Sequence, residues 1–176
     1  MELTDEIIVK RTTNSRLKEV DFDKLGFGTY ISDHMLISNY KNGQWETPQI
    51  VPFGDLSLSP TTLALHYGQS VFEGMKAFKL DDGRINLFRI HKHYERFTKS
   101  LHRMCMTPVP EETFIEGLRK LVEVDSAWIP TTEGSSLYIR PLQFASEAKF
   151  GVKVSDEYIF LVFTGPVAPA FGQPIK

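Results

Sequence analysis

The chain has 176 residues and contains only one cysteine, Cys105. A single cysteine excludes an internal disulfide framework and any zinc cluster built from cysteines. We expect Cys105 to be a small buried hydrophobic residue. The sequence also lacks an apolar run long enough to span a bilayer, and its start has no cationic-then-apolar layout of a signal peptide. These absences predict a cytoplasmic protein without a membrane partner.

An excess of charge of one sign is also lacking. The formal net charge is -2, which argues against a general nucleic-acid or membrane-surface binder. The phosphate-binding patterns G-x-x-x-x-G-K-[ST] and G-x-G-x-x-G and the nucleophile pattern G-x-S-x-G do not occur. His91 and His93 are two residues apart on an expected helix, so their side chains diverge and we expect both to be solvated. No metal site is predicted.

The residues that are present predict one domain with a substantial core. Hydrophobic residues make up 41% of the chain. Asn42 and Gly43 stand between two apolar runs, which predicts a hairpin formed by residues 30–40 and 44–51. Pro141 indicates an edge or bulge position within its strand. Further strands are expected at 71–80, 84–88, 136–144 and 158–163, and helices at 90–104 and 110–124.

Hairpins interleaved with a pair of helices predict an α+β fold, with an antiparallel-dominated sheet and the helices packed on one face. Residues 1–25 are polar and charged, which is typical of an arm or an edge strand. We expect the domain itself to occupy residues 26–165. The Pro- and Gly-rich residues 166–176 have the composition of a linker.

Three places have the residue types of a small-molecule site. Residues 64–78 combine aromatic side chains, a phenolic hydroxyl and glycines, which is typical of a pocket wall. Arg96 borders the apolar stripe of its helix, where it is either part of a solvated face or a bidentate anion ligand. Tyr138 and Arg140 lie on one face of a strand, which is either pocket-lining or solvent-exposed.

Five segments, in this order, resemble the branched-chain amino acid aminotransferases, which are fold-type IV enzymes that depend on pyridoxal 5'-phosphate. The similarity runs from about Leu25 to Pro169. Any one segment alone is weakly specific, but five in register are strongly so. The segments are LGFGTYISDHM, ALHYGQSVFEGMKAF, LFRIHKHYERF, SLYIRP and KFGVKV.

The resemblance implies that Arg96 binds the cofactor phosphate and that a set of pocket residues binds the substrate. It implies a homodimeric full enzyme in which Tyr67 and the loop residues Phe150 and Val152 reach the active site of the neighbouring subunit. The substrates would be leucine, isoleucine and valine together with glutamate and 2-oxoglutarate. The implied substrate-binding residues are Phe27, Tyr67, Phe72, Tyr138, Arg140, Phe150 and Val152.

In this family the Schiff-base lysine belongs to a second, larger domain, so no catalytic residue is expected within this chain. Lys76 is expected to be solvated or to face an edge. The chain alone is expected to be inactive and to bind pyridoxal phosphate weakly or not at all. Two alternatives stay open: another fold-type IV enzyme, such as a D-amino acid transaminase or an aminodeoxychorismate lyase, and a non-catalytic association module.

Overall fold

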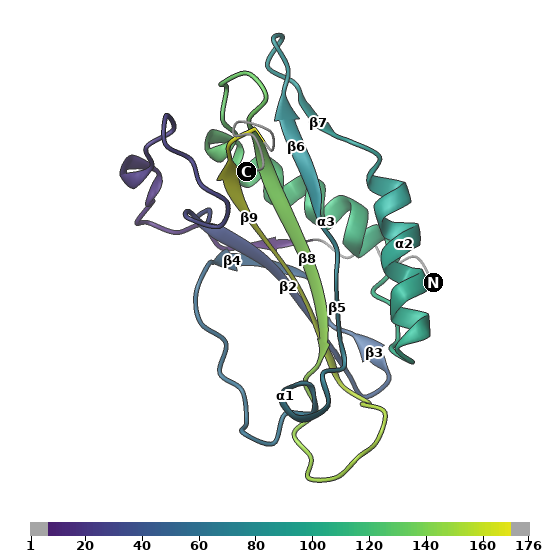
Figure 1. Cartoon of the computed structure of the whole chain (residues 1–176). Coiled ribbons are helices and arrows are strands. Elements are labelled where there is room, and N and C mark those ends of the chain that lie inside the picture. The colour runs from purple at the N-terminus through teal and green to yellow at the C-terminus, as the bar shows by residue number, and fades with distance from the viewer. Residues whose placement is uncertain (1–6, 170–176) are drawn as a thin grey trace, which may run out of the picture.

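The computed structural model describes residues 7–169, which form a single curled sheet with helices on one face (Figure 1). The strands are β1 (Ile8–Val9), β2 (His34–Lys41), β3 (Gln44–Trp45), β4 (Gln49–Pro52), β5 (Ser70–Phe72), β6 (Met75–Lys79), β7 (Ile85–Leu87), β8 (Ser136–Ala145) and β9 (Tyr158–Val167). The helices are α1 (Leu63–Tyr67), α2 (Ile90–Arg103) and α3 (Glu111–Val124).

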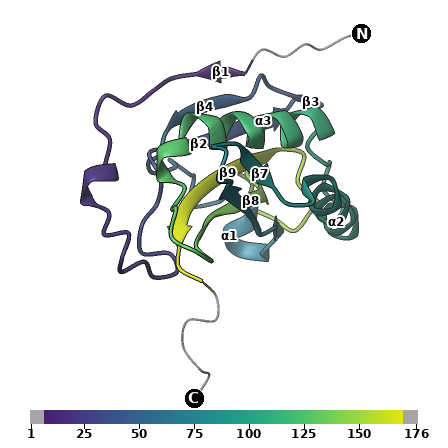
Figure 2. The same cartoon turned by 90° about the horizontal axis from the view of Figure 1, so that it is seen from above.

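The strand order is β1-β4-β2-β9-β8-β6-β7, with β3 paired to β2 and β5 paired to β8. Every pairing is antiparallel except that of β1 with β4. Figure 2 shows α3 lying over one face of the sheet with α2 beside it, and α3 contacts both β2 and α2. The predicted α+β class, with helices on one face of an antiparallel-dominated sheet, is confirmed.

Strand β9 is the centre of this sheet, between β2 and β8. Most of its side chains are buried, as its run of aromatic and branched residues predicts. The strand continues to Val167, so Pro166 and Val167 belong to the sheet although they fall within the predicted linker range. Residues 170–176 of the predicted linker lie outside the described residues.

Helices α2 and α3 form where the period of the sequence predicts them, and their apolar faces meet above the sheet. The rings of Phe97, Phe114 and Phe160 lie with their centroids 5.6–6.0 Å apart, which joins both helices to β9. Gly117 lies within α3, and an added Cβ there would come within 2.6 Å of Leu36 Cδ2 on β2. The glycine therefore allows α3 to approach the sheet closely.

The predicted hairpin is confirmed. Asn42 and Gly43 have φ of 53° and 80°, as a two-residue turn with both central residues in the left-handed region requires. The returning strand is divided into β3 and β4, and β2 begins at His34 rather than at Tyr30. The polar N-terminal arm contributes the short edge strand β1, also as predicted.

The arm is attached to the domain through hydrogen bonds to the buried carboxylate of Asp33. Asp33 accepts hydrogen bonds from the Ser15 hydroxyl at 2.6 Å, the Arg16 N–H at 2.9 Å and the Trp128 indole at 3.0 Å. Burial alone would raise the pKa of Asp33, but these hydrogen bonds outweigh it and hold that pKa below its usual value. The arm therefore depends on an ionised carboxylate.

Some local expectations are wrong. Residues 71–80 do not form one strand, because the strand is interrupted between β5 and β6. The short helix α1 was not expected. Cys105 is exposed rather than buried, with φ of 55° just after the end of α2. Among residues 7–169, no helix has the length and apolarity needed to cross a membrane.

Candidate functional site

The site is built around the interruption at Glu73 and Gly74. Strands β5 and β6 pair with β8 in the same register, so no residue is inserted between them. The Glu73 N–H donates to the Pro141 carbonyl at 2.9 Å, but Pro141 has no N–H with which to complete the pair. The expectation of an edge or bulge at Pro141 is therefore wrong: β8 is an interior strand, and the proline lies opposite the gap in its neighbours.

Gly74 makes room for a tyrosine. A Cβ added to Gly74 would lie 2.3 Å from the Tyr138 hydroxyl oxygen, so only a glycine allows the phenol to lie where it does. The Arg140 Nη2 donates a hydrogen bond of 3.0 Å to the same hydroxyl. The aromatic ring of Tyr138 packs edge-on against Phe27, with 5.0 Å between the ring centroids.

Arg140 is held between two aromatic rings. Its guanidinium carbon lies 4.5 Å from the ring centroid of Phe72 and 5.3 Å from that of Tyr138, within the range of cation–π attraction. Its Nε is buried and has no hydrogen-bond partner within the described part of the chain. The guanidinium is thus fixed in direction while some of its donors remain unused.

Two adjacent cavities lie beside this group. One, of about 150 Å³, is bordered by the rings of Phe27 and Tyr138, by Arg140 and by the end of β9. The other, of about 380 Å³, shares Phe27 and Tyr138 and is bordered also by Lys76. Of the two alternatives expected for Lys76, the edge position is wrong, because β6 lies between β8 and β7; the side chain is partly buried and borders this cavity. Four of the predicted substrate-binding residues therefore meet in one place: Phe27, Phe72, Tyr138 and Arg140.

The other three lie elsewhere. Tyr67 ends α1, and Phe150 and Val152 lie in the loop 146–157, with side chains left 93% and 84% exposed. The two segments are joined, because the Leu63 N–H donates to the Glu147 carbonyl at 3.0 Å. These residues form a second exposed apolar group, at the end of the domain where α1 lies (Figure 1).

Two ion pairs of Lys153 close the loop that carries Phe150 and Val152. Lys153 Nζ lies 2.9 Å from a Glu147 carboxylate oxygen and 2.6 Å from a carboxylate oxygen of Asp156. The lysine thereby ties the two ends of the loop together. Such closure reduces the number of conformations in which the two apolar side chains are presented.

Arg96 lies on α2 with its side chain 67% exposed, and its fork contacts the carboxylate of Glu73. Nε donates to Oε2 at 2.7 Å, and Nη2 donates to Oε1. Burial alone would raise the pKa of Glu73, but the hydrogen bonds from Arg96 and the Gly74 N–H, together with the charge of Arg96, lower it below its ordinary value. Glu73 is therefore an ionised, buried partner of this arginine.

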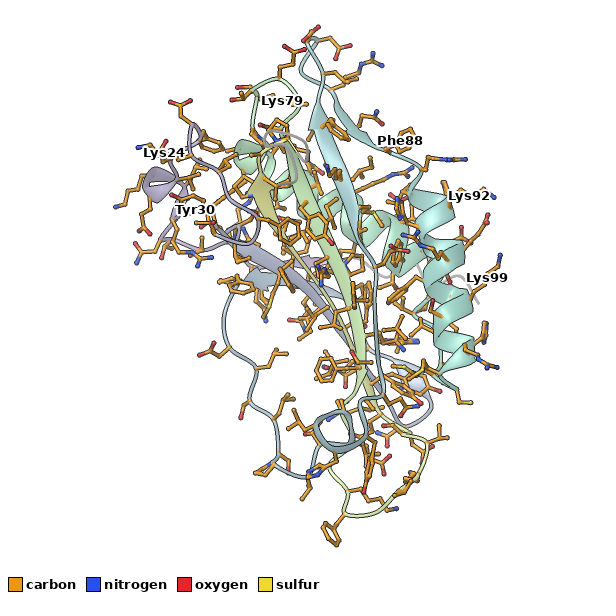
Figure 3. All side chains as sticks on the ribbon, in the orientation of Figure 1. Lys24, Tyr30, Lys79, Phe88, Lys92 and Lys99 are labelled. Atoms are coloured by element: carbon orange, nitrogen blue, oxygen red, sulfur yellow. The ribbon has the colours of Figure 1, made fainter. Side chains whose placement is uncertain are left out.

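The sequence reasoning missed Glu73 and misjudged His93. Nδ1 of His93 is buried, 3.6 Å from Glu73 Oε1, so this histidine is not solvated. By contrast, Lys92 and Lys99 project from the outer side of α2 (Figure 3). The sequence signal for Glu73 is a charged residue placed before a glycine in an otherwise apolar stretch. Its partner Arg96 is 23 residues away, so the sequence does not reveal the pairing.

The fold defines the class of the protein: it has the small domain of a fold-type IV aminotransferase. The structure of a T.th. branched-chain amino acid aminotransferase with pyridoxamine 5'-phosphate has a TM-score of 0.60 and 27% identity, over 78% of this chain and 41% of that one. The same enzyme complexed with N-(5'-phosphopyridoxyl)-L-glutamate gives a TM-score of 0.58 and 28% identity, over 74% of this chain and 40% of that one.

Sequence comparison identifies the family. Branched-chain-amino-acid transaminase 1 of Bacillus subtilis is 41% identical over 96% of this chain and 48% of its own length. A probable branched-chain-amino-acid aminotransferase of Staphylococcus epidermidis is 43% identical over 93% of this chain and 46% of its own length. No protein-family profile matches the sequence. The chain belongs with the branched-chain amino acid aminotransferases and spans about half the length of the curated relatives it matches.

Proposed function

We propose that this sequence is the small domain of a pyridoxal phosphate-dependent enzyme that transfers an amino group between branched-chain amino acids and 2-oxoglutarate. The observation that carries the proposal is the placement of Arg140 between the rings of Phe72 and Tyr138, beside Phe27. The family relationship supports it, because the relatives bear the names of branched-chain aminotransferases.

The pocket suits two different substrates. Phe27 in the cavity wall, with Phe72 nearby against Arg140, supplies apolar surface that favours leucine, isoleucine and valine, since each buried methylene contributes about 0.8 kcal/mol. Glutamate carries a second carboxylate, which is costly to bury without a cation. Arg140 supplies that cation, and the Tyr138 hydroxyl supplies a further polar group next to it.

Arg96 fits the phosphate of the cofactor. Its fork uses Nε and Nη2 for Glu73, and within residues 7–169 no hydrogen bond engages Nη1. The outer edge of the guanidinium therefore has donors directed toward solvent, in the geometry that binds phosphate oxygens in pairs. When bound, pyridoxal phosphate supplies the electron sink for amino transfer.

The second apolar group supports a homodimer. Tyr67, Phe150 and Val152 are exposed at the end of the domain, apart from the pocket of their own chain. We assign them to the active site of a neighbouring subunit, where their apolar surface would be covered. We also propose a cytoplasmic location for the protein and a division of the chain into an arm, a domain and a linker.

The test uses the complete polypeptide in which this sequence occurs. We expect turnover of L-leucine with 2-oxoglutarate, and this turnover should fall sharply in an Arg140→Ala variant. Activity with D-alanine but not with L-leucine would instead indicate a D-amino acid transaminase.

The 176-residue chain alone is expected to show no turnover, because the family's lysine belongs to its larger domain. A spectral titration of that chain with pyridoxal phosphate should show a weak absorbance shift or none. Measurable transaminase turnover from the isolated chain would contradict this part of the proposal.

A further inference from the structure

Glu73 is an unusual residue for its position. It is charged, yet only 5% exposed, and it lies between two strands that pack against the core. Hydrogen bonds fix both its backbone and its side chain. Its backbone N–H donates to the Pro141 carbonyl, and its carboxylate accepts the Gly74 N–H at 2.8 Å. The carboxylate is therefore a rigid point on the sheet.

Arg96 is the opposite kind of residue, since it is long, mostly exposed and carried by a helix. An arginine of this kind has many rotamers when it is unpaired. A guanidinium has two edges that can each bind an oxyanion in a bidentate manner. Glu73 occupies the edge formed by Nε and Nη2, which leaves the edge formed by Nη1 and Nη2.

We propose that Glu73 is a positioning residue, which fixes the guanidinium of Arg96 so that its free edge faces the phosphate of the cofactor. The inference rests on the proposed function, in which Arg96 binds that phosphate. Glu73 reaches the anion only through the arginine. His93 lies beside the same carboxylate, with Nδ1 3.6 Å from Oε1.

A simple electrostatic view leads to the opposite expectation. A carboxylate beside an arginine cancels part of its positive charge, so removing that carboxylate would strengthen the binding of phosphate. Positioning predicts a loss instead, because a freed arginine must be immobilised again when the anion binds. The sign of the change in phosphate affinity separates the two views.

The experiment compares the affinities of the complete polypeptide for pyridoxal 5'-phosphate and for pyridoxal, which has no phosphate, by absorbance titration. The ratio of the two affinities measures the grip on phosphate. We expect Glu73→Gln to reduce this ratio by about three- to tenfold, the equivalent of immobilising one flexible side chain. Purely structural damage would weaken both ligands alike and leave the ratio unchanged.

The matched control is Glu95→Gln, which removes the same charge from α2 beside Arg96 but from a side chain paired with Lys92. Its ratio should stay as in the wild type. If Glu73→Gln fails to fold, Glu73→Asp retains the charge with a shorter reach and should reduce the ratio as well. An unchanged or increased ratio in the folded Glu73 variant overturns the inference.

Arg96→Ala separates the two proposals from each other. If it does not reduce the ratio, the phosphate role proposed for Arg96 is wrong. If it does, Glu73→Gln should have no further effect in that background, because Glu73 acts through the arginine. An equal loss from Glu73→Gln in both backgrounds would overturn positioning and leave the role of Arg96 intact.

Discussion

Replacement of Gly74 by alanine tests the geometry of the pocket most directly. The new Cβ would lie 2.3 Å from the Tyr138 hydroxyl oxygen and 3.1 Å from Cζ of the ring, so the phenol must move. Ordinary contact requires the hydroxyl to retreat by about 1 Å. Tyr138 would then separate from the guanidinium of Arg140, to which it is now hydrogen-bonded.

The effect on stability should be modest, because the end of a partly exposed side chain can move. We expect a cost of about 1 kcal/mol, at the low end for an overpacked site, and a decrease in Tm of about 2–4 °C. The effect on catalysis should be larger. In the proposed function Tyr138 binds the substrate, and a shift of about 1 Å in such a group typically lowers the rate by up to about 100-fold.

The assay measures kcat/KM for L-leucine and for glutamate, together with thermal unfolding, in the complete polypeptide. Gly54→Ala is the matched control, since a Cβ at that glycine meets no atom within 4 Å. It should leave both quantities unchanged. The double variant Gly74→Ala with Tyr138→Phe should recover part of the lost stability, because the closest contact is removed. Full kcat/KM in Gly74→Ala would refute the reasoning.

Further predictions concern stability. Phe114→Ala should lower the free energy of unfolding by about 3–5 kcal/mol, measured by urea denaturation, because this fully buried ring joins α3 to β9; a loss below about 1 kcal/mol would contradict that position. Gly117→Ala should also destabilise, by about 1–3 kcal/mol, because Leu36 is fully buried and cannot give way; a gain in stability would show that α3 has room. The pKa of Asp33 is lower in the folded protein than its ordinary value of 3.8. The ionised carboxylate therefore stabilises the folded state above pH 3.8, and this contribution is lost as the pH falls through the pKa of the folded state. Stability should therefore decrease below about pH 4, and more weakly in Asp33→Asn; equal pH profiles for the two proteins would show that Asp33 makes no such contribution.

Much of the fold could be read from local patterns in the sequence. The turn at Asn42 and Gly43 follows from the tolerance of these residues for positive φ, and the two helices follow from their apolar spacing. The run at β9 is apolar on both faces because the strand is central. These signals depend only on neighbouring residues, so they do not require the rest of the structure.

The candidate site was predicted in part and by a different route. The composition of residues 64–78 indicates a pocket wall, but the roles of Phe27, Arg96 and Arg140 came from resemblance to a family. The sequence pattern alone did not distinguish a ligand-binding Arg96 from a solvated one. It also assigned Tyr67 and Phe72 to one wall, whereas Phe72 packs against Arg140 and Tyr67, five residues earlier at the end of α1, borders neither cavity.

The sequence by itself determined the class of fold, the main strands and helices, and the family. Only the tertiary structure decided which residues meet: Gly74 beneath Tyr138, Glu73 against Arg96, and Lys76 at a cavity. Each of these placements brings together segments that are far apart in the chain. A buried charge is stable only beside a partner, and that partner becomes known only when the sheet and α2 are in place.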